Sequence, residues 1–225
     1  MLTPPATLPR VLLTGFDPFG GDSVNPSWLA VSALEGRRIL KHRVVAARLP
    51  TEFDLSLQIL KHLMSYHRPK IVICVGQAGG RNAMGLERVA INVNDARIPD
   101  NAGQQPIDTP VVARGPAAYF STLPLKAMAQ DLRRAGLSVE MSQSAGTFVC
   151  NHVFYGLMHT LASRKWTALG VRGGFVHVPW LPDQGTPSMP LADMVRGLEL
   201  GVRCALRHQS CGVLSAQARS GGALH

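Results

Sequence analysis

Hydrophobic and polar positions along the chain predict strands and helices in alternation. Short apolar runs of the kind found in buried strands cover residues 10–16, 43–49, 71–75, 88–94, 137–142 and 173–178. Helical spacing or capping signals predict helices from Asn25, from about Thr51, and over 124–135, 149–163 and 190–206. Since strands joined by single helices form mainly parallel sheets covered on both faces, we expect a three-layer α/β/α sandwich with a twisted sheet.

Two of the predicted helices have recognisable start signals. Asn25 has the side chain of an N-cap, and Pro26 follows at the first helical position. Thr51 and Asp54 resemble a capping box, and Phe53, Leu57, Leu60 and Met64 follow at helical spacing.

The length and composition are those of one globular domain. The chain has 225 residues, 46% of them hydrophobic and 16% charged, so it can bury a substantial core. We expect a single domain over 1–225 with flexible tails over about 1–9 and 208–225, because the C-terminal residues are small and polar.

The same sequence indicates a cytoplasmic protein. No apolar run approaches the ~18 residues that a membrane span needs, and the first ten residues lack the basic and apolar regions of a secretory signal. The four cysteines show no CxxC spacing, which favours free thiols in a reducing compartment and argues against a thiol-based redox protein; they are Cys74, Cys150, Cys204 and Cys211.

The net charge of +9 raises the question of nucleic-acid binding. The positive charges are spread out, and basic runs are no longer than pairs such as Arg37–Arg38 and Arg133–Arg134. No basic stripe is interleaved with aromatic residues, so we do not expect a nucleic-acid partner.

Cys150 is the first candidate for chemistry, because it lies near the start of a predicted helix. Phe154, Leu157, Met158 and Leu161 share its helix face, so the residue is either an inert core cysteine or a thiolate nucleophile. A free thiol has a pKa of about 8.5, and a helix end supplies only ~0.3–1 kcal/mol. A nucleophilic cysteine here therefore needs a histidine partner as well.

His177 is the candidate for that partner. It lies at the end of an apolar strand, just before Pro179, and ligands gather at the carboxyl ends of strands in parallel sheets. A core histidine satisfied by the backbone is the alternative. His152 and His159 point away from Cys150 on an intact helix, and the remaining histidines are expected at the surface; these are His42, His62, His67, His208 and His225.

Glu87 is the candidate for an acid that orients the imidazole. In ERVAINVN, Glu87, Val89, Ile91 and Val93 would share one strand face, on which Glu87 is the only charged residue. The alternative is a strand end with Glu87 paired to Arg81. Asp17, Asp95, Asp100 and Asp183 are rivals that lie among turn signals.

The glycine-rich turn GFDPFGG directly follows the first strand. It matches neither the dinucleotide nor the P-loop pattern, so no nucleotide site is expected. Phe16 and Phe19 either pack in the core or line an apolar slot at the edge of the sheet.

Four blocks of the sequence resemble signature stretches of the pyroglutamyl peptidase I family of cysteine peptidases, also called pyrrolidone-carboxylate peptidases. The blocks are GFDPFGGDSVNPS, ERVAINVNDARIPDNAGQQP, SAGTFVCNHVFY and GFVHVPW, in the family's order. The stretch around Ser163 to Val171 looks longer than in the family, and the chain past residue 207 has no counterpart in it.

The resemblance implies an activity, a set of site residues and a partner. It implies removal of an N-terminal pyroglutamyl residue from peptides, with no cofactor and no metal, by a homo-oligomer such as a tetramer. The implied catalytic residues are Glu87, Cys150 and His177, with Arg97 near the oxyanion. The implied substrate-binding residues are Phe16, Phe19, Asn25, Gln77, Arg97, Ile98, Phe148 and Val149. The alternative function is a catalytically silent homologue that binds acidic partners through its arginines.

Overall fold

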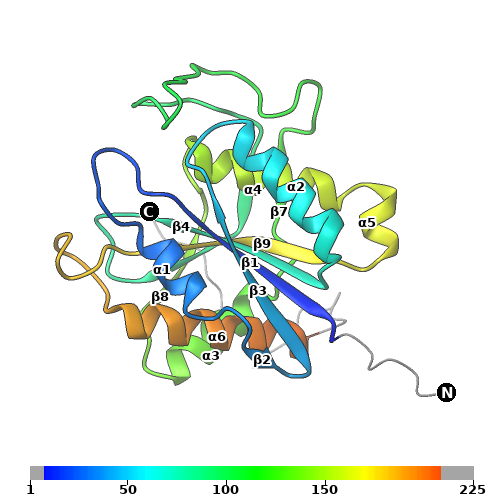
Figure 1. Cartoon of the computed structure of the whole chain (residues 1–225), viewed down its shortest axis with the longest axis vertical. Coiled ribbons are helices and arrows are strands. Elements are labelled where there is room, and N and C mark those ends of the chain that lie inside the picture. The colour runs from blue at the N-terminus through cyan, green and yellow to red at the C-terminus, as the bar shows by residue number, and fades with distance from the viewer. Residues whose placement is uncertain (1–7, 209–225) are drawn as a thin grey trace.

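Strands and helices alternate along most of the chain in a computed structural model, which describes residues 8–208 (Figure 1). The strands are β1 (Arg10–Phe16), β2 (Arg38–Ile39), β3 (His42–Leu49), β4 (Ile71–Gln77), β5 (Met84–Glu87), β6 (Val89–Ile91), β7 (Ala118–Phe120), β8 (Val139–Ser142) and β9 (Arg172–Val178). The helices are α1 (Pro26–Ser32), α2 (Leu55–His67), α3 (Leu125–Arg134), α4 (Val149–Leu161), α5 (Arg164–Ala168) and α6 (Leu191–Arg207). The predicted tails lie almost entirely outside the described residues.

The main sheet has seven strands in the order β2-β3-β1-β4-β9-β5-β8. Strands β3, β1, β4 and β9 are parallel to one another, while β2 is antiparallel to β3. Strand β5 is antiparallel to β9 and parallel to β8. Because β9 lies between β4 and β5, His177 of β9 has Gly76 of β4 on one side and Gly85 of β5 on the other. Strands β6 and β7 form a separate antiparallel pair.

Helices cover both faces of the main sheet and enclose two apolar clusters. Val11 and Leu13 of β1 point into a cluster with α1, α3 and α6, and Leu12 and Phe16 point into one with α2 and α4. Figure 1 shows α2, α4 and α5 on one side of the sheet and α1, α3 and α6 on the other. This alternation along β1 confirms the predicted three-layer α/β/α sandwich. Within residues 8–208, no helix has both the length and the apolar character of a membrane span.

The start of α1 agrees with the sequence, whereas the start of α2 does not. Asn25 caps α1 by accepting a hydrogen bond from the Ser27 N–H at 3.0 Å, with Pro26 at the first position. The predicted capping box at α2 is wrong: Asp54 makes no side-chain cap bond, and the Thr51 hydroxyl donates to the Asp17 carbonyl at 2.8 Å. The physical reason is a distant carboxylate of Asp100, which accepts the Phe53 N–H at 2.7 Å and fixes this turn.

The predicted strand over 88–94 is also different in the structure. Strand β5 ends at Glu87 and β6 begins at Val89 in another sheet, so Glu87, Val89 and Ile91 do not share one strand face. The chain leaves the main sheet at Arg88, whose N–H donates to the Ser142 carbonyl at 2.9 Å. Four elements were not predicted, namely β2, β5, β7 and α5, and α5 lies within the stretch around 163–171 that looked long for the family.

Candidate active site

The carboxyl ends of β4 and β9 meet beside the start of α4, and this is where the three catalytic candidates lie. Cys150 is the second residue of α4, His177 is the penultimate residue of β9, and Glu87 is the last residue of β5. The reversed direction of β5 brings its end alongside Phe175 of β9, on the same strand as His177. Three segments that are far apart in the sequence thus contribute one side chain each.

The thiol of Cys150 fits against a glycine of the sheet. A Cβ atom added to Gly76 would lie 2.7 Å from Cys150 Sγ and 2.9 Å from the Phe175 ring. Gly76 is also the direct neighbour of His177 in the sheet. The missing side chain at Gly76 therefore leaves the space in which sulfur and imidazole meet.

Glu87 and His177 form a buried pair. The Nδ1 atom of His177 lies 2.7 Å from Glu87 Oε1, and the two side chains are only 6% and 0% exposed. Because the ring has two nitrogen atoms and Nδ1 faces the carboxylate, Nε2 is left for the thiol. An acid that fixes the imidazole in this way is a standard part of nucleophilic sites.

The pKa of His177 depends on both Glu87 and Cys150. Burial alone would lower it, but hydrogen bonds with the Cys150 side chain and with Glu87, together with their negative charges, raise it to about 9. The imidazole is therefore suited to hold a proton next to a thiolate and to donate that proton within the site.

The first turn of α4 is held in place by the segment that follows Glu87. The Asn151 side chain accepts the Ile91 N–H at 3.0 Å and donates to the carbonyls of Ile91 and Val93, both at 2.9 Å. His152 contacts Asn94 Oδ1 at 3.1 Å and accepts the Asp54 N–H at 3.2 Å. As the sequence predicts, His152 thus points away from Cys150, and burial lowers its pKa to about 4.

Aromatic side chains gather next to the catalytic candidates. Phe19 and Phe148 have ring centroids 5.9 Å apart, and the Phe53 ring meets Phe148 edge-on at 5.5 Å. Phe16 is buried and lies 6.3 Å from Phe175, so it packs in the core as well as ending β1. Val149, the first residue of α4, is also buried.

Two polar candidates hold the loop after β1. Asn25 donates to the Asp17 carbonyl at 3.0 Å and caps α1, so both ends of its amide are used within the protein. Gln77 donates through Nε2 to Asp22 at 3.0 Å, while its Oε1 atom is buried and has no hydrogen-bond partner among the described residues. Only Gln77 therefore has an unused hydrogen-bonding atom.

Arg97 and Ile98 lie on the loop that follows β6. Ile98 is 43% exposed, and its side chain approaches Gly20 of the loop after β1. Arg97 is exposed and forms no ion pair within residues 8–208. No side-chain hydrogen bond of Arg97 is found among the described residues either, and its oxyanion role stays a prediction.

The other cysteines and acids have different surroundings. Cys74 and Cys204 are free but buried, and burial raises the pKa of each to about 12. Cys150 is the only partly exposed cysteine in the described part of the chain. Asp100 is buried but serves a turn, where it accepts the N–H groups of Ala102 and Gln104. Asp17 pairs with Arg48 at 2.8 Å.

One histidine differs from its predicted environment, and three residues of the site were not predicted from the sequence. His42 is buried and contacts the Leu40 carbonyl at 2.8 Å in the tight β2–β3 turn, while His225 lies outside the described residues. The unpredicted residues are Phe53, Gly76 and Gly85. The apolar spacing that placed Phe53 on a helix was its only signal, and no local pattern marks either glycine.

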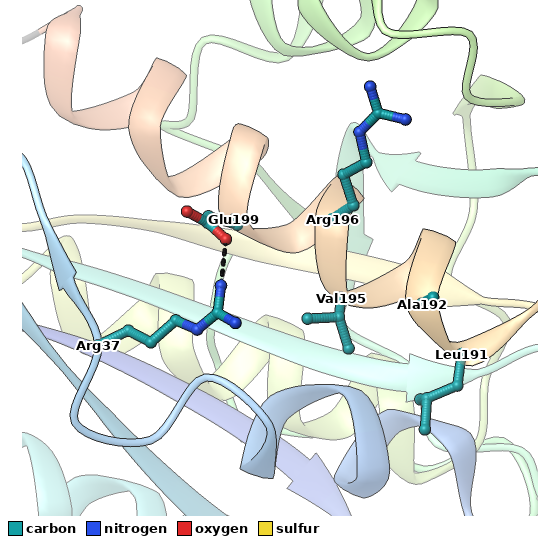
Figure 2. Close-up of a pocket in the computed structure, with 6 residues that line it drawn as sticks. All are labelled: Arg37, Leu191, Ala192, Val195, Arg196 and Glu199. Carbon is teal, nitrogen blue, oxygen red and sulfur yellow. Dashed lines mark hydrogen bonds and ion pairs between the residues drawn. The ribbon is translucent and has the colours of Figure 1, made fainter.

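A shallow hollow lies away from this site, between α6 and the segment after α1 that carries Arg37 (Figure 2). It is lined by Arg37, Leu191, Ala192, Val195, Arg196 and Glu199. Helix α6 covers the face of the sheet opposite to α4, so this hollow is separated from Cys150 by the sheet. Within residues 8–208, no group of three His, Cys, Asp or Glu side chains is arranged to hold a metal ion.

Comparison with known families and curated proteins gives one consistent result. The family model for pyroglutamyl peptidase matches residues 9–208. Pyrrolidone-carboxylate peptidase 1 of Ralstonia nicotianae is 56% identical over 207 residues, which cover 90% of this chain and 95% of that protein. The pyrrolidone-carboxylate peptidase of Cupriavidus taiwanensis is 56% identical over 204 residues, with 88% and 94% coverage.

Solved structures agree with these relatives. The crystal structure of pyroglutamyl peptidase I from Bacillus amyloliquefaciens is similar with a TM-score of 0.86 and 46% identity, and the match covers 89% of this chain and 98% of that one. The pyrrolidone carboxyl peptidase from Thermococcus litoralis is similar with a TM-score of 0.85 and 36% identity, with 89% and 94% coverage.

Proposed function

Because the chain belongs to the pyroglutamyl peptidase family, we propose that it is a cysteine peptidase that removes an N-terminal pyroglutamyl residue from peptides. The observation that carries this proposal is the series Glu87–His177–Cys150, in which Glu87 bonds the imidazole at 2.7 Å and the Cys150 side chain helps to raise the pKa of His177. This series has the thiol, base and orienting acid that nucleophilic acyl transfer needs.

In the first half of the proposed reaction, Cys150 is the nucleophile. Its thiolate attacks the pyroglutamyl carbonyl carbon, and the oxygen becomes an oxyanion in a tetrahedral intermediate. The Cys150 N–H at the start of α4, together with Arg97, would stabilise this oxyanion; one such donor is typically worth ~2.7–4 kcal/mol. The C–N bond then breaks, and His177 gives its proton to the leaving amine.

In the second half, His177 acts as the base. The imidazole that lost its proton takes one from a water molecule, and the hydroxide attacks the thioester carbonyl. The C–S bond breaks, which releases pyroglutamate and restores the thiolate beside a protonated His177. Glu87 keeps the ring in one orientation through both halves.

The pyroglutamyl ring is a neutral lactam, and the surroundings of Cys150 suit such a group. Phe16, Phe19 and Phe148 would provide apolar walls, with Ile98 and Val149 next to them. Gln77 has a buried Oε1 atom without a partner, which could accept the lactam N–H. Asn25 would act on the substrate only indirectly, by holding the loop after β1. A cationic N-terminus would lose its hydration here without compensation, so blocked peptides are favoured.

The proposal extends to assembly, location and cofactors. We expect a homo-oligomer, with a tetramer as the specific expectation, in the cytoplasm, and catalysis without a cofactor or metal. Light scattering coupled to size-exclusion chromatography tests the assembly, because a tetramer has four times the chain mass of 24.2 kDa.

A fluorogenic assay tests the activity. Purified protein with a thiol reductant should release aminomethylcoumarin from its pyroglutamyl derivative, and iodoacetamide should stop the release. The same fluorophore attached to unblocked glutamine is the control and should be released far more slowly. Absence of release at every pH from 6 to 9 would rule out the proposed function.

A further inference from the structure

The buried carboxylate of Glu87 needs a positively charged partner throughout the proposed reaction. Its side chain is fully buried, Oε1 bonds His177, and Oε2 has no hydrogen-bond partner among the described residues. In the proposed reaction His177 gives its proton to the leaving amine, so for part of each cycle the imidazole is neutral. During that time a buried negative charge would have lost its cationic partner, which is costly in a protein interior.

Arg81 is the cation that remains when His177 is neutral. Its Nη1 atom lies 3.7 Å from Glu87 Oε1 and 3.2 Å from Glu140 Oε1. The Arg81 side chain is 33% exposed, and that of Glu140 is 49% exposed. The guanidinium therefore stands between a surface carboxylate and the buried one, and it keeps its charge at every pH of interest.

A glycine makes this approach possible. A Cβ atom added to Gly85 would lie 2.9 Å from Arg81 Nη1, 3.3 Å from Glu87 Oε1 and 3.5 Å from the His177 Cβ atom. Gly85 thus leaves open the passage through which the guanidinium reaches the pair. Gly85 is also the sheet neighbour of His177. The absence of a side chain at Gly85 therefore affects both the Arg81–Glu87 distance and the Glu87–His177 distance.

We propose that Arg81 is a positioning residue, whose permanent positive charge pairs with the Glu87 carboxylate and keeps it against His177 while the imidazole gains and loses its proton. The proposal rests on the peptidase function proposed above. It differs from a purely structural ion pair, because it requires the charge of Arg81 to affect proton transfer within the site.

The neighbours of Glu87 determine the expected direction of the effect. His177 approaches from β9, Cys150 of α4 is in contact with His177, and Glu140 lies on β8 beyond Arg81. Helix α6 contacts β5 through Gly197 and Met84 and brings no charged group to Glu87 among the described residues. Removing the positive charge of Arg81 makes every proton of this cluster harder to remove. Both limbs of the pH–rate profile should therefore move to higher pH.

The test is the pH profile of kcat/KM for Arg81→Gln, with the pyroglutamyl-coumarin substrate and the intact protein. We expect both limbs to move upward by about 0.5–1 pH unit, which is less than a fully buried partner would cause because Arg81 is partly exposed. Arg81→Lys should restore at least half of the shift. Arg37→Gln, which removes an arginine paired with Glu199 of α6, is the matched control and should leave the profile unchanged.

Two further measurements test the role of Arg81 even if Arg81→Gln does not fold or the protein shows no peptidase activity. Gly85→Ala displaces the guanidinium but retains its charge, so it should move the profile in the same direction even if Arg81→Gln does not fold. The rate of Cys150 alkylation by iodoacetamide against pH, followed by mass spectrometry, should show the same upward shift without any peptide substrate. If the wild-type protein hydrolyses no substrate, the peptidase proposal fails, while the alkylation profiles still test Arg81. Superimposable profiles for the wild type and Arg81→Gln would overturn the role of Arg81, as would an equal shift in Arg81→Lys.

Discussion

Burial distinguishes the cysteine at the site from the other two described cysteines. Cys74 lies on β4 two residues before Gly76, yet it is fully buried with a pKa raised to about 12. Cys150 is partly exposed, and its side chain is one of the groups that raise the pKa of His177. Among these three cysteines, only Cys150 is therefore both accessible and close to a histidine, as the proposed nucleophile must be.

We predict that Cys150→Ser lowers turnover by at least about 1000-fold, because a hydroxyl is a far weaker nucleophile than a thiolate. Cys74→Ala, which removes a buried thiol without adding an unpaired polar group, should keep most of the activity. Steady-state assays of both variants check this. Comparable losses in the two variants would move the nucleophile away from Cys150.

The pKa of His177 leads to a prediction about stability. A group whose pKa is raised in the folded protein stabilises it fully below its unfolded pKa, here about 6.5, and this contribution is lost as the pH rises through the folded value of about 9. The free energy of unfolding should therefore fall by a few kcal/mol between these two pH values.

Urea denaturation at several pH values measures this dependence. His177→Gln cannot titrate at this position but can still donate to Glu87, so its unfolding free energy should vary less over the same range. Equal slopes for the two proteins would contradict the raised pKa.

At the residue level, the sequence predicts those site residues that lie in a recognisable local pattern. The helix start marked Cys150, and the strand end before Pro179 marked His177. The pattern that indicates Glu87 is a single charge on an apolar strand face, and the structure does not contain that face. Glu87 contacts both His177 and Arg81, which are the partners named by its two alternatives. Long-range pairing of this kind has no signature in sequence spacing.

At the level of elements, α4 depends on side chains of its first turn. Asn151 makes three hydrogen bonds to the backbone around β6, and it lies directly after Cys150. The orientation of Cys150 thus depends on a contact between a helix of one layer and the small sheet formed by β6 and β7.

We predict that Asn151→Ala lowers the free energy of unfolding by about 2–4 kcal/mol, because several buried hydrogen bonds are lost. It should also lower kcat more than it raises KM, since the thiol is no longer held in place. Thr160→Ala, which removes one hydrogen bond within the last turns of α4, is the control and should cost less than about 1 kcal/mol. Chemical denaturation and steady-state kinetics check both. Unchanged kcat in Asn151→Ala would show that the contact has no role in positioning.

The helices and strands that the sequence predicts are those on which burial between layers imposes a pattern. Continuous apolar runs gave β1, β4 and β9, and helical spacing gave α3, α4 and α6, because burial between layers imposes these patterns. The turn before α2 differs from the prediction because Asp100, far away in the sequence, replaces the expected cap. The short strands β2 and β7 have too few residues to show a period.

At the level of the whole molecule, the basic residues behind the net charge of +9 are spread along the sequence, and their longest runs are pairs. Many arginines pair with acids, for example Arg48 with Asp17 and Arg207 with Asp131. A dispersed charge of this kind gives weak, salt-dependent attraction to polyanions without a defined site.

We predict that duplex DNA does not bind with a Kd below about 1 μM at 150 mM salt, and that saturating DNA leaves peptidase turnover unchanged. Fluorescence anisotropy with a labelled duplex measures the first, and the fluorogenic assay measures the second. Tight binding that persists at this salt concentration, combined with absence of turnover, would favour the alternative of a silent homologue that binds acidic partners.

The reversed strand β5 has a consequence for how the protein acquires its activity. Glu87 reaches His177 only after β9, ninety residues further along the chain, has been inserted between β4 and β5. Contacts of such high sequence separation form late, because the intervening chain must be ordered first. During renaturation, hydrolysis should consequently return after the helical circular dichroism signal has recovered. The recovery of enzymatic activity would then report when β9 is inserted between β4 and β5.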